Sequence, residues 1–469
     1  MKVLFVASEC APVAKVGGLA DVVGALPKSL LKMAVNVSVL IPFYGSLKIK
    51  KSGLKLVLNK EKIFFNKKWE SFNLWQTFLP KTNVCLFLIE NEKYFYGSIY
   101  LEADASSGGS VKEAERFLFL SAVAKKVIEI LKFDIVHLHD WHTAIVASLF
   151  KNKSQESKIK SIKTLLTVHN LQYQGIYSYQ LVNDLLNTDF KEDVNCLKEG
   201  IISADFINTV SISYAREILT PEYGYGLERF LNKRKKELRG ILNGIDTYEF
   251  NPATDKNLKV NYSIKDIDKK IENKIYLQKK FFKKENVDTP FLGMVSRLAN
   301  QKGIDLIKEI FPLLMKENLQ FVILGRGMKE YENFFREKKK EFPQKFWAEI
   351  DFNDKLARQI YAAVDIFLMP SLFEPCGLGQ LIAMRYGSLP LVRQVGGLKD
   401  TVNEKTGFLF KNYNSKELLS TIRKALEIYY KDKKTWQKMQ KKAMKQDFSW
   451  EKSAKKYLAL YQKISNKNN

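Results

Sequence analysis

Two successive blocks of alternating strand-like and helix-like segments constrain the fold of this chain more than any other feature. In the first block, short apolar runs rich in β-branched residues occur at 2–8, 36–41, 84–89, 134–138, 163–168 and 206–210. The second block has such runs at 291–296, 321–324, 347–350, 366–370 and 389–393, with amphipathic segments near 303–316, 329–338, 354–363 and 377–386. This alternation predicts parallel sheets with right-handed crossovers. We therefore expect an α/β protein with two Rossmann-like, doubly wound domains that bind ligands outside the carboxyl ends of their strands.

The domain boundaries follow from the positions of these blocks. We place an N-terminal domain at 1–242 and a second domain at 243–446, with the hinge near 243–255, where a polar, lysine-rich stretch begins. The remaining segment, 447–469, contains a helical stripe formed by Ala454, Tyr457, Leu458, Tyr461 and Ile464. No strand follows this apolar stripe, so we expect the terminal helix to cross back and pack on the first domain.

The composition excludes several classes of protein. Of the 469 residues, 46% are hydrophobic and 27% are charged, which is ordinary for a globular protein and excludes wholesale disorder. No run approaches the roughly 18 apolar residues of a membrane span, and the apolar run after Lys2 is too short for a signal peptide. The four cysteines form no CxxC pair, which argues against a disulfide framework or a zinc ribbon. We expect a cytoplasmic protein without a membrane partner.

The net charge of +25 suggests an anionic partner, because strongly basic chains attract nucleic acids, anionic membranes and phosphorylated small molecules. Much of the excess lies in lysine runs, for example at 233–236, 338–340 and 441–445. Recognition of RNA would also require aromatic residues interleaved in a binding platform or a known module, and the sequence shows neither. We interpret most of the charge as solvated surface and expect no nucleic-acid partner.

The first strand leads into a glycine pair, in the segment Lys15-Val16-Gly17-Gly18. Paired glycines at the start of a helix allow backbone amides to approach an anion closely, and the helix N-terminus favours negative charge. The segment is neither a GxGxxG fingerprint nor a Walker A loop, so it supports neither NAD binding nor a P-loop mechanism. Its alternative interpretation is a tight turn with a surface lysine.

All four histidines of the chain follow or end two neighbouring predicted strands. His137, His139 and His142 lie in the segment 136–142 with Asp140, and His169 precedes Asn170 at the end of the next strand. Ligands and catalytic groups gather at such strand ends in α/β folds. A His-x-His segment with a nearby Asp and His also has the residue types of a metal site, and buried structural histidines are a third interpretation. We expect no metal.

The second block contains three further groups of candidate residues at strand ends. Arg297 and Lys302 place two cations where a strand gives way to a helix, a pair suited to a departing diphosphate without Mg²⁺. Glu374 stands before a proline in a turn and could hold sugar hydroxyls, while the segment Cys376-Gly377-Leu378 would present backbone amides at a helix start. Cys376 itself is better explained as a packed residue than as a nucleophile. Gly396 and Gly397 offer a second glycine cradle of the same kind.

Taken in order, these motifs resemble those of bacterial glycogen synthases and plant starch synthases that use ADP-glucose. The matching segments span essentially the whole chain and are 15–19, 139–142, 167–171, 243–246, 296–298 with 301–303, 373–378, and 396–398 with 400–402. The resemblance implies a retaining glycosyltransferase of the GT-B type, in which two Rossmann-like domains face a cleft. It implies ADP-glucose and an α-1,4-glucan as substrates, and no cofactor.

The resemblance also implies roles for individual residues. Lys15, with the amides of Gly17 and Gly18, would contact the diphosphate or the glucose of the donor. Arg297 and Lys302 would stabilise the ADP leaving group, and Glu374 would hold hydroxyls of the transferred glucose. The remaining residues would line the reacting face or orient donor and acceptor groups: His169, Asn170, Asp21, Asp140 and Asn243.

A single central carboxylate disfavours the two-carboxylate scheme of retaining glycosidases. We expect front-face transfer, in which the acceptor 4-hydroxyl attacks from the side on which ADP departs. Three alternatives remain from the sequence: a related glycosyltransferase that uses UDP-glucose or a small acceptor, a metallohydrolase built on the clustered histidines, and a nucleic-acid-binding protein.

Overall fold

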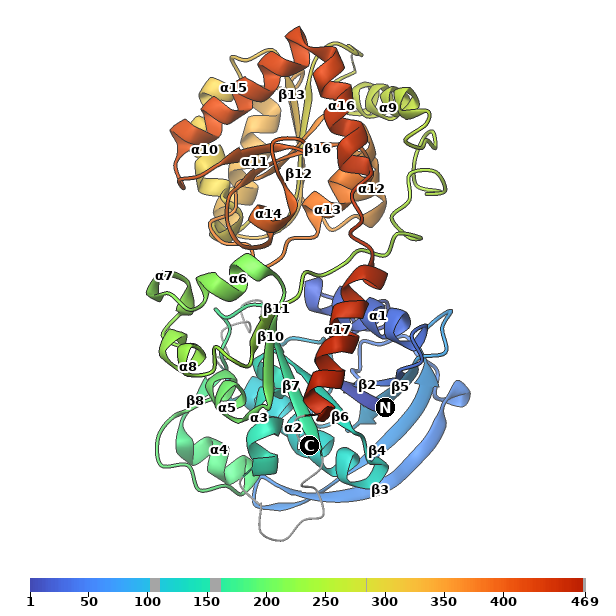
Figure 1. Cartoon of the computed structure of the whole chain (residues 1–469), viewed down its shortest axis with the longest axis vertical. Coiled ribbons are helices and arrows are strands. Elements are labelled where there is room, and N and C mark those ends of the chain that lie inside the picture. The colour runs from blue at the N-terminus through green and yellow to red at the C-terminus, as the bar shows by residue number, and fades with distance from the viewer. Residues whose placement is uncertain (102–109, 152–161, 284, 467–469) are drawn as a thin grey trace. The chain divides into compact units, whose positions relative to one another are not determined.

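The computed structural model describes residues 1–101, 110–151, 162–283 and 285–466 (Figure 1). Its contacts divide the chain into two compact units. Unit 1 comprises Met1–Gly244 together with Trp450–Asn469, and unit 2 comprises Ile245–Ser449. The terminal helix thus belongs to unit 1, although the sequence of unit 2 separates it from the rest of that unit.

Unit 1 is built on a nine-stranded sheet with the order β11-β10-β7-β6-β1-β2-β5-β4-β3. The strands in this sheet are β1 (Lys2–Val6), β2 (Asn36–Pro42), β3 (Lys55–Phe65), β4 (Lys68–Phe78), β5 (Cys85–Glu90), β6 (Ile135–His139), β7 (Lys163–Val168), β10 (Phe206–Thr209) and β11 (Leu238–Gly240). The seven strands from β11 to β5 pair in parallel, and their apolar runs are buried on both faces of the sheet. A separate short pair is formed by β8 (Ile176–Tyr177) and β9 (Val194–Asn195).

The helices of unit 1 connect these strands. They are α1 (Gly18–Leu31), α2 (Val111–Leu131), α3 (Trp141–Lys151), α4 (Tyr179–Leu186), α5 (Cys196–Ser203), α6 (Ile212–Glu217), α7 (Pro221–Gly224), α8 (Glu228–Lys233) and α17 (Trp450–Ser465), with a 3₁₀ turn η1 (Lys51–Gly53). Side chains at several N-caps accept a backbone hydrogen bond, as Ser110 does before α2 and Ser178 before α4.

One edge of the unit 1 sheet differs from the all-parallel expectation. Strands β3 and β4 form an antiparallel hairpin, and β4 also pairs antiparallel with β5. Asn66 and Lys67 make the hairpin turn with positive φ angles. The sequence analysis did not predict this hairpin, because the register shifts between Leu56 and Glu61 interrupt the alternation of apolar and polar residues in β3.

Helix α17 packs beside α1 and reaches the polar centre of the unit 1 sheet (Figure 1). The Tyr461 hydroxyl and Nδ1 of His137 share a hydrogen bond of 2.8 Å, and Asn208 donates to the Tyr457 hydroxyl at 2.8 Å. All four of these side chains are buried. The terminal helix is therefore fastened to unit 1 by two specific polar contacts in addition to its apolar stripe.

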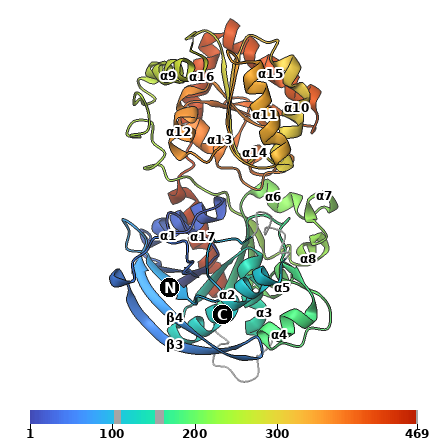
Figure 2. The ribbon, with the colours of Figure 1, turned by 180° about the vertical axis from the view of Figure 1, so that it is seen from behind.

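Unit 2 has a six-stranded sheet with the order β14-β13-β12-β15-β16-β17, and all of its strand pairs are parallel. The strands are β12 (Phe291–Val295), β13 (Gln320–Leu324), β14 (Phe346–Glu349), β15 (Ile366–Met369), β16 (Leu389–Arg393) and β17 (Phe408–Phe410). Figures 1 and 2, which view the chain from opposite sides, show helices flanking both faces of this sheet. Unit 2 is thus a doubly wound α/β fold.

The helices of unit 2 follow its strands in sequence. They are α9 (Lys270–Phe282), α10 (Ile304–Leu314), α11 (Lys329–Glu341), α12 (Asp354–Ala363), α13 (Gly379–Arg385), α14 (Gly396–Thr401), α15 (Ser415–Lys431) and α16 (Lys433–Met444), with 3₁₀ turns η3 (Ile267–Lys269) and η4 (Asn300–Lys302). Among the described residues, no helix is long and apolar enough to cross a membrane.

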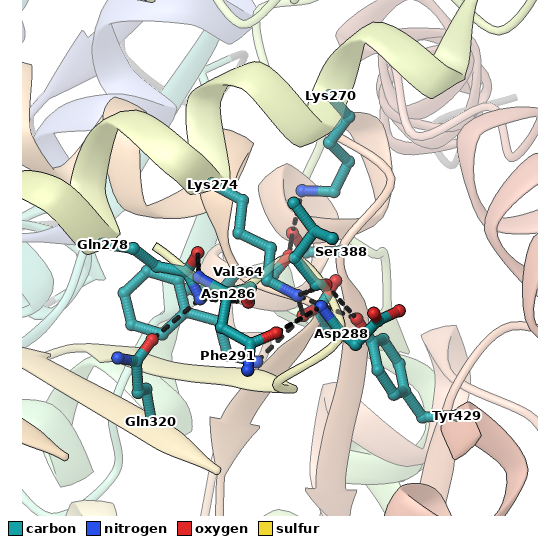
Figure 3. Close-up of polar contacts among 12 residues, drawn as sticks. Lys270, Lys274, Gln278, Asn286, Asp288, Phe291, Gln320, Val364, Ser388 and Tyr429 are labelled. Carbon is teal, nitrogen blue, oxygen red and sulfur yellow. Dashed lines mark hydrogen bonds and ion pairs between the residues drawn. The ribbon is translucent and has the colours of Figure 1, made fainter. Parts of the chain in front are cut away.

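A buried polar cluster closes the amino ends of the strands in unit 2 (Figure 3). Lys274 pairs with Asp365 at 2.8 Å and donates to the Tyr429 hydroxyl, while Lys270 donates to the Ala362 carbonyl and to Ser388. Burial lowers the pKa of the Lys270 amine to about 7. Because ligands of doubly wound folds bind at the opposite, carboxyl ends of the strands, this cluster holds the fold together away from the candidate site.

Candidate active site

The predicted site residues lie at the carboxyl ends of neighbouring strands in each unit. In unit 1 all of them except Asn243 follow β1, β6 and β7, which are adjacent in the sheet, whereas Asn243 follows the edge strand β11. In unit 2 they follow β12, β15 and β16, which are also adjacent. Each unit thus has its own group of candidate residues at the carboxyl ends of its strands.

The glycine loop of unit 1 is organised by a carboxylate that the sequence analysis missed. Oε2 of Glu9 accepts hydrogen bonds from the amides of Val16 (2.6 Å) and Gly17 (2.8 Å), and Oε1 accepts one from the Tyr100 hydroxyl (2.6 Å). Glu9 is only 3% exposed. The amide of Gly17, predicted to contact an anion, is therefore bonded within the chain, whereas Gly18 has open space where a side chain would extend. An acidic residue directly after a buried strand was the signal that could have drawn attention to Glu9.

Lys15 and Asp21, which flank the two glycines in the sequence, form an ion pair. Their charged atoms are 2.6 Å apart, and the side chains are 39% and 34% exposed. Exposed pairs of this kind contribute only about 0–1 kcal/mol to stability. An anionic ligand can therefore displace Asp21 from Lys15 at little energetic cost.

Asp140 shapes the loop that carries His169 and Asn170. Its backbone has a φ of 55°, a conformation that Asp tolerates better than most residues. Oδ1 accepts hydrogen bonds from the amides of His169 (2.6 Å) and Asn170 (3.4 Å). Burial raises the pKa of the Asp140 carboxyl to about 7, against the opposing effect of these two bonds. We predicted that Asp140 orients substrate groups. In the structure its carboxyl holds the backbone of the loop that follows β7.

The four histidines form two hydrogen-bonded groups and one stacked ring. His137 is bonded through both ring nitrogens, to Tyr461 and to the Thr167 hydroxyl (2.6 Å). Nδ1 of His139 lies 2.9 Å from Nε2 of His169, and His142 stacks on Trp141. Burial lowers the pKa of all four rings, to about 3 for His142 and His169. Within the described ranges, no group of three His, Cys, Asp or Glu residues is placed to hold a metal ion.

Asn170 and Asn243 complete the candidate residues of unit 1. Oδ1 of Asn170 accepts a hydrogen bond from the amide of Gln172 at 3.1 Å. Asn243 is buried, and its Oδ1 has no hydrogen-bond partner in the part of the chain that the structure describes. An unpaired buried oxygen of this kind is uncommon in folded proteins.

In unit 2, Lys302 and Glu374 form a buried ion pair. Nζ of Lys302 lies 2.6 Å from Oε2 of Glu374, and the side chains are 17% and 7% exposed. The Ser371 hydroxyl donates to the same oxygen at 3.1 Å. Gly303, with a φ of 71°, allows the two loops to meet, because a Cβ there would lie 2.1 Å from the carbonyl oxygen of Pro370. Arg297 lies shortly before Lys302 in the sequence. Its side chain is exposed, and its guanidinium donates a hydrogen bond to the side chain of Gln301.

The two glycine segments of unit 2 pack against each other. The Gly397 amide donates to the Glu374 carbonyl at 3.0 Å, and a Cβ at Gly397 would lie 2.1 Å from the carbonyl oxygen of Cys376. Cys376 is buried, and Gly377 and Gly396 both have positive φ angles. Leu378 is half-buried at the start of α13.

Gln380 is a second residue that the sequence analysis missed. Its amide nitrogen donates to the carbonyls of Cys376 and Gly377, both at 3.0 Å. These contacts fix the glycine turn that follows Glu374. A polar residue in an otherwise apolar helix, as Gln380 is in α13, was the available signal.

Both units match known protein families. Residues 2–233 match the family described as the starch synthase catalytic domain, and residues 277–446 match the glycosyl transferases group 1. Among curated proteins, the chain is 43% identical to a glycogen synthase of Thermosipho melanesiensis, with complete coverage of both chains. It is 42% identical to a glycogen synthase of Bacillus cereus, over 99% of this chain and 100% of that protein.

Two solved structures show the same architecture. The catalytic domain of starch synthase IV from Arabidopsis thaliana, bound to ADP and acarbose, has a TM-score of 0.90 and 33% identity over 99% of each chain. Sucrose-phosphate synthase from Thermosynechococcus elongatus has a TM-score of 0.64 and 16% identity, over 99% of this chain and 98% of that chain. The second similarity is one of fold alone.

Proposed function

The chain belongs to the family of glycogen synthases and starch synthases, which have a GT-B fold, and on this premise we propose that it transfers glucose from ADP-glucose to the non-reducing end of an α-1,4-glucan, with retention of configuration. The observation that carries the proposal is the similarity to glycogen synthases over the complete length of the chain. The starch synthase structure that holds ADP and acarbose supports a nucleotide sugar and a glucan as the two substrates.

The cations of unit 2 are suited to the departure of ADP. Lys302 is a half-buried point charge, held in place by Glu374, and Arg297 is an exposed guanidinium that follows β12. A guanidinium binds phosphate through two parallel hydrogen bonds, and a partly desolvated ammonium stabilises developing charge more strongly than it does in water. Together they neutralise the negative charge that develops on the leaving diphosphate.

Glu374 orients the transferred glucose. Its Oε2 accepts hydrogen bonds from Lys302 and Ser371, so the remaining lone pairs of the carboxylate are directed to sugar hydroxyls. Eight residues later stands Ile382, which offers no second carboxylate. A covalent double displacement needs two carboxyl groups about 5 Å apart. Transfer therefore proceeds on the front face, where the departing phosphate takes the proton of the attacking 4-hydroxyl.

The reaction as proposed needs no metal ion, since Arg297 and Lys302 supply the positive charge. His169 and Asn170, on the loop that Asp140 fixes, line the reacting face. His137 is hydrogen-bonded through both ring nitrogens and His139 through one, whereas the ring nitrogens of His142 have no partner among the described residues. Since no group of three His, Cys, Asp or Glu residues in this part of the chain is placed to hold a metal ion, no observation supports the metallohydrolase alternative.

Three measurements test the proposal: the preferred sugar donor, the preferred acceptor and the linkage of the product. The purified chain is incubated with ADP-glucose or UDP-glucose, and with glycogen, a malto-oligosaccharide or free glucose as acceptor. We expect rapid transfer only from ADP-glucose to the two glucans, and we expect an α-1,4-specific hydrolase to release the newly added glucose completely. Preference for UDP-glucose or for the small acceptor would contradict the proposal, as would a product with a β-linkage.

A further inference from the structure

His139 is a buried histidine that the proposed reaction does not use, yet its ring nitrogen contacts the one histidine that the reaction does use. It ends β6, and His169 lies just after the neighbouring strand β7, where His139 pairs in register with Thr167. The two rings are nearly parallel, with centroids 5.3 Å apart, and Nδ1 of His139 lies 2.9 Å from Nε2 of His169. His139 is fully buried, whereas His169 is partly exposed.

The surroundings of His139 determine which of the two nitrogens donates. Nε2 of His139 is buried and has no hydrogen-bond partner in the described part of the chain. A buried N–H without an acceptor is costlier and rarer than a buried lone pair without a donor. The proton of His139 therefore sits on Nδ1, which donates to Nε2 of His169. A neutral His169 must then carry its own proton on Nδ1.

Both rings stay neutral at physiological pH because burial disfavours the charged imidazolium. The pKa of His169 is lowered to about 3, and that of His139 is lowered by burial and by the neighbouring histidines. Asp140, whose pKa burial raises to about 7, accepts hydrogen bonds from the backbone amides of His169 and Asn170, so its titration acts on the backbone of this loop and not on a ring nitrogen. A single tautomer of His169 therefore persists across the working pH range.

The position of His139 is fixed from several sides. Its ring stacks on Phe5, with centroids 5.2 Å apart, and on His137, with centroids 4.3 Å apart. Its backbone amide donates to the Thr143 hydroxyl at 2.8 Å. His137 is in turn held by the Tyr461 hydroxyl of the terminal helix α17. The layer of rings therefore extends from α17 to the partly exposed His169.

We propose that His139 is a positioning residue of the transferase, which donates from Nδ1 to Nε2 of His169 and thereby holds His169 as the Nδ1–H tautomer. The Nδ1–H of His169, the ring nitrogen left open to a ligand, is then the donor that unit 1 offers to a sugar hydroxyl at the end of β7. The sugar contact rests on the proposed function, whereas the tautomer is a property of the free protein.

The tautomer is measured directly by nitrogen-15 NMR of the full chain labelled at histidine, which has only four rings to resolve. In the wild-type protein we expect His169 to show a protonated Nδ1 and an accepting Nε2, unchanged between about pH 6 and pH 8. A protonated Nε2 on His169 would overturn the proposal. So would an imidazolium signal in this range.

Two variants of His139 separate positioning from packing. His139→Ala removes the donor, so His169 should populate both tautomers and kcat should fall by about 10- to 100-fold with a smaller change in KM for the donor. His139→Asn places an amide N–H where Nδ1 was, and should restore the Nδ1–H tautomer and most of the lost rate. If His139→Ala left the tautomer of His169 unchanged, or if Asn failed to restore it, the proposal would be wrong.

His142→Ala is the matched control. His142 is also buried and stacked, but neither of its ring nitrogens has a hydrogen-bond partner among the described residues. Its replacement should lower stability without altering the tautomer of His169, and a tautomer change of the same size as in His139→Ala would contradict a specific role for His139. If the wild-type protein transferred no glucose while the NMR results held, the proposed function would fail and the histidine pair would stand.

Discussion

Replacement of Lys302 by Met removes the cation that contacts Glu374 while keeping most of the apolar volume of the side chain. The charged atoms of this pair are 2.6 Å apart, and the two side chains are 17% and 7% exposed. The carboxylate of Glu374 would keep only the Ser371 hydroxyl as a hydrogen-bond donor among the contacts described above. The substitution therefore leaves a buried negative charge without its counter-ion.

The magnitude follows from the geometry of the pair. At an effective dielectric constant of about 20, charges about 2.6 Å apart attract by about 6 kcal/mol, but desolvation offsets much of this gain. Removal of one partner of a buried pair typically costs about 3–5 kcal/mol. We expect about 3 kcal/mol for Lys302→Met, because the Ser371 bond remains. For a unit of about 200 residues, this lowers Tm by about 6–12 °C.

The double variant Lys302→Met with Glu374→Gln distinguishes stability from catalysis. With both charges removed, the free energy of unfolding should return to within about 1 kcal/mol of the wild-type value, because the net contribution of a buried ion pair is small. Turnover should stay at least about 10²-fold below wild type in both variants, since each lacks a group that we propose to act on the donor. Thermal unfolding by calorimetry and glucose transfer to glycogen provide the two measurements.

Two outcomes would refute this reasoning. If Lys302→Met kept a near-normal rate, the cation would have no part in the departure of ADP. If the double variant were as unstable as Lys302→Met alone, the loss would come from packing of the Lys302 side chain and not from an uncompensated charge.

Three further predictions concern a glycine contact and two titrating groups. Gly397→Ala should lower both Tm and turnover, because its Cβ would lie 2.1 Å from the carbonyl oxygen of Cys376, and calorimetry with a transfer assay measures both. Burial raises the pKa of Asp140 to about 7, so the folded state binds this proton more tightly than the unfolded state does, and the stability of wild type relative to Asp140→Asn should fall as pH rises from about 4 to about 7 in urea titrations. Burial lowers the pKa of Lys270 to about 7, so the unfolded state binds more protons above that pH, and the stability of wild type relative to Lys270→Met should rise between about pH 7 and pH 10. A constant difference across either pH range would contradict the corresponding pKa shift.

The alternation of apolar runs with amphipathic segments was sufficient to predict two doubly wound units. Parallel strands are buried on both faces, so their sequences read as continuous apolar runs that stand out from the rest. The hairpin of β3 and β4 was missed because it lies at a sheet edge, where one face is exposed and bulges interrupt the period of two. Edge strands of this kind carry a weaker pattern than central ones.

In the candidate site, too, some residues could be recognised from the sequence and others could not. The location of Lys302 and Glu374 after two adjacent strands could be predicted from their motifs, whereas their roles in the reaction stay predictions. Glu9 and Gln380 could not be recognised, because each acts by bonding backbone groups that only the fold brings within reach. The contact between His139 and His169 likewise depends on the register of two strands whose sequences are about thirty residues apart.

In the proposed reaction, cations of the protein, without a metal ion, support the extension of a glucan from ADP-glucose. Its most direct test is the steady-state rate of labelled glucose transfer from ADP-glucose to glycogen by the wild-type chain, measured with and without an excess of EDTA. We expect equal rates in both conditions and release of one ADP for each glucose transferred. Loss of transfer in EDTA that added Mg²⁺ or Mn²⁺ restores would contradict it, as would the absence of transfer in both conditions.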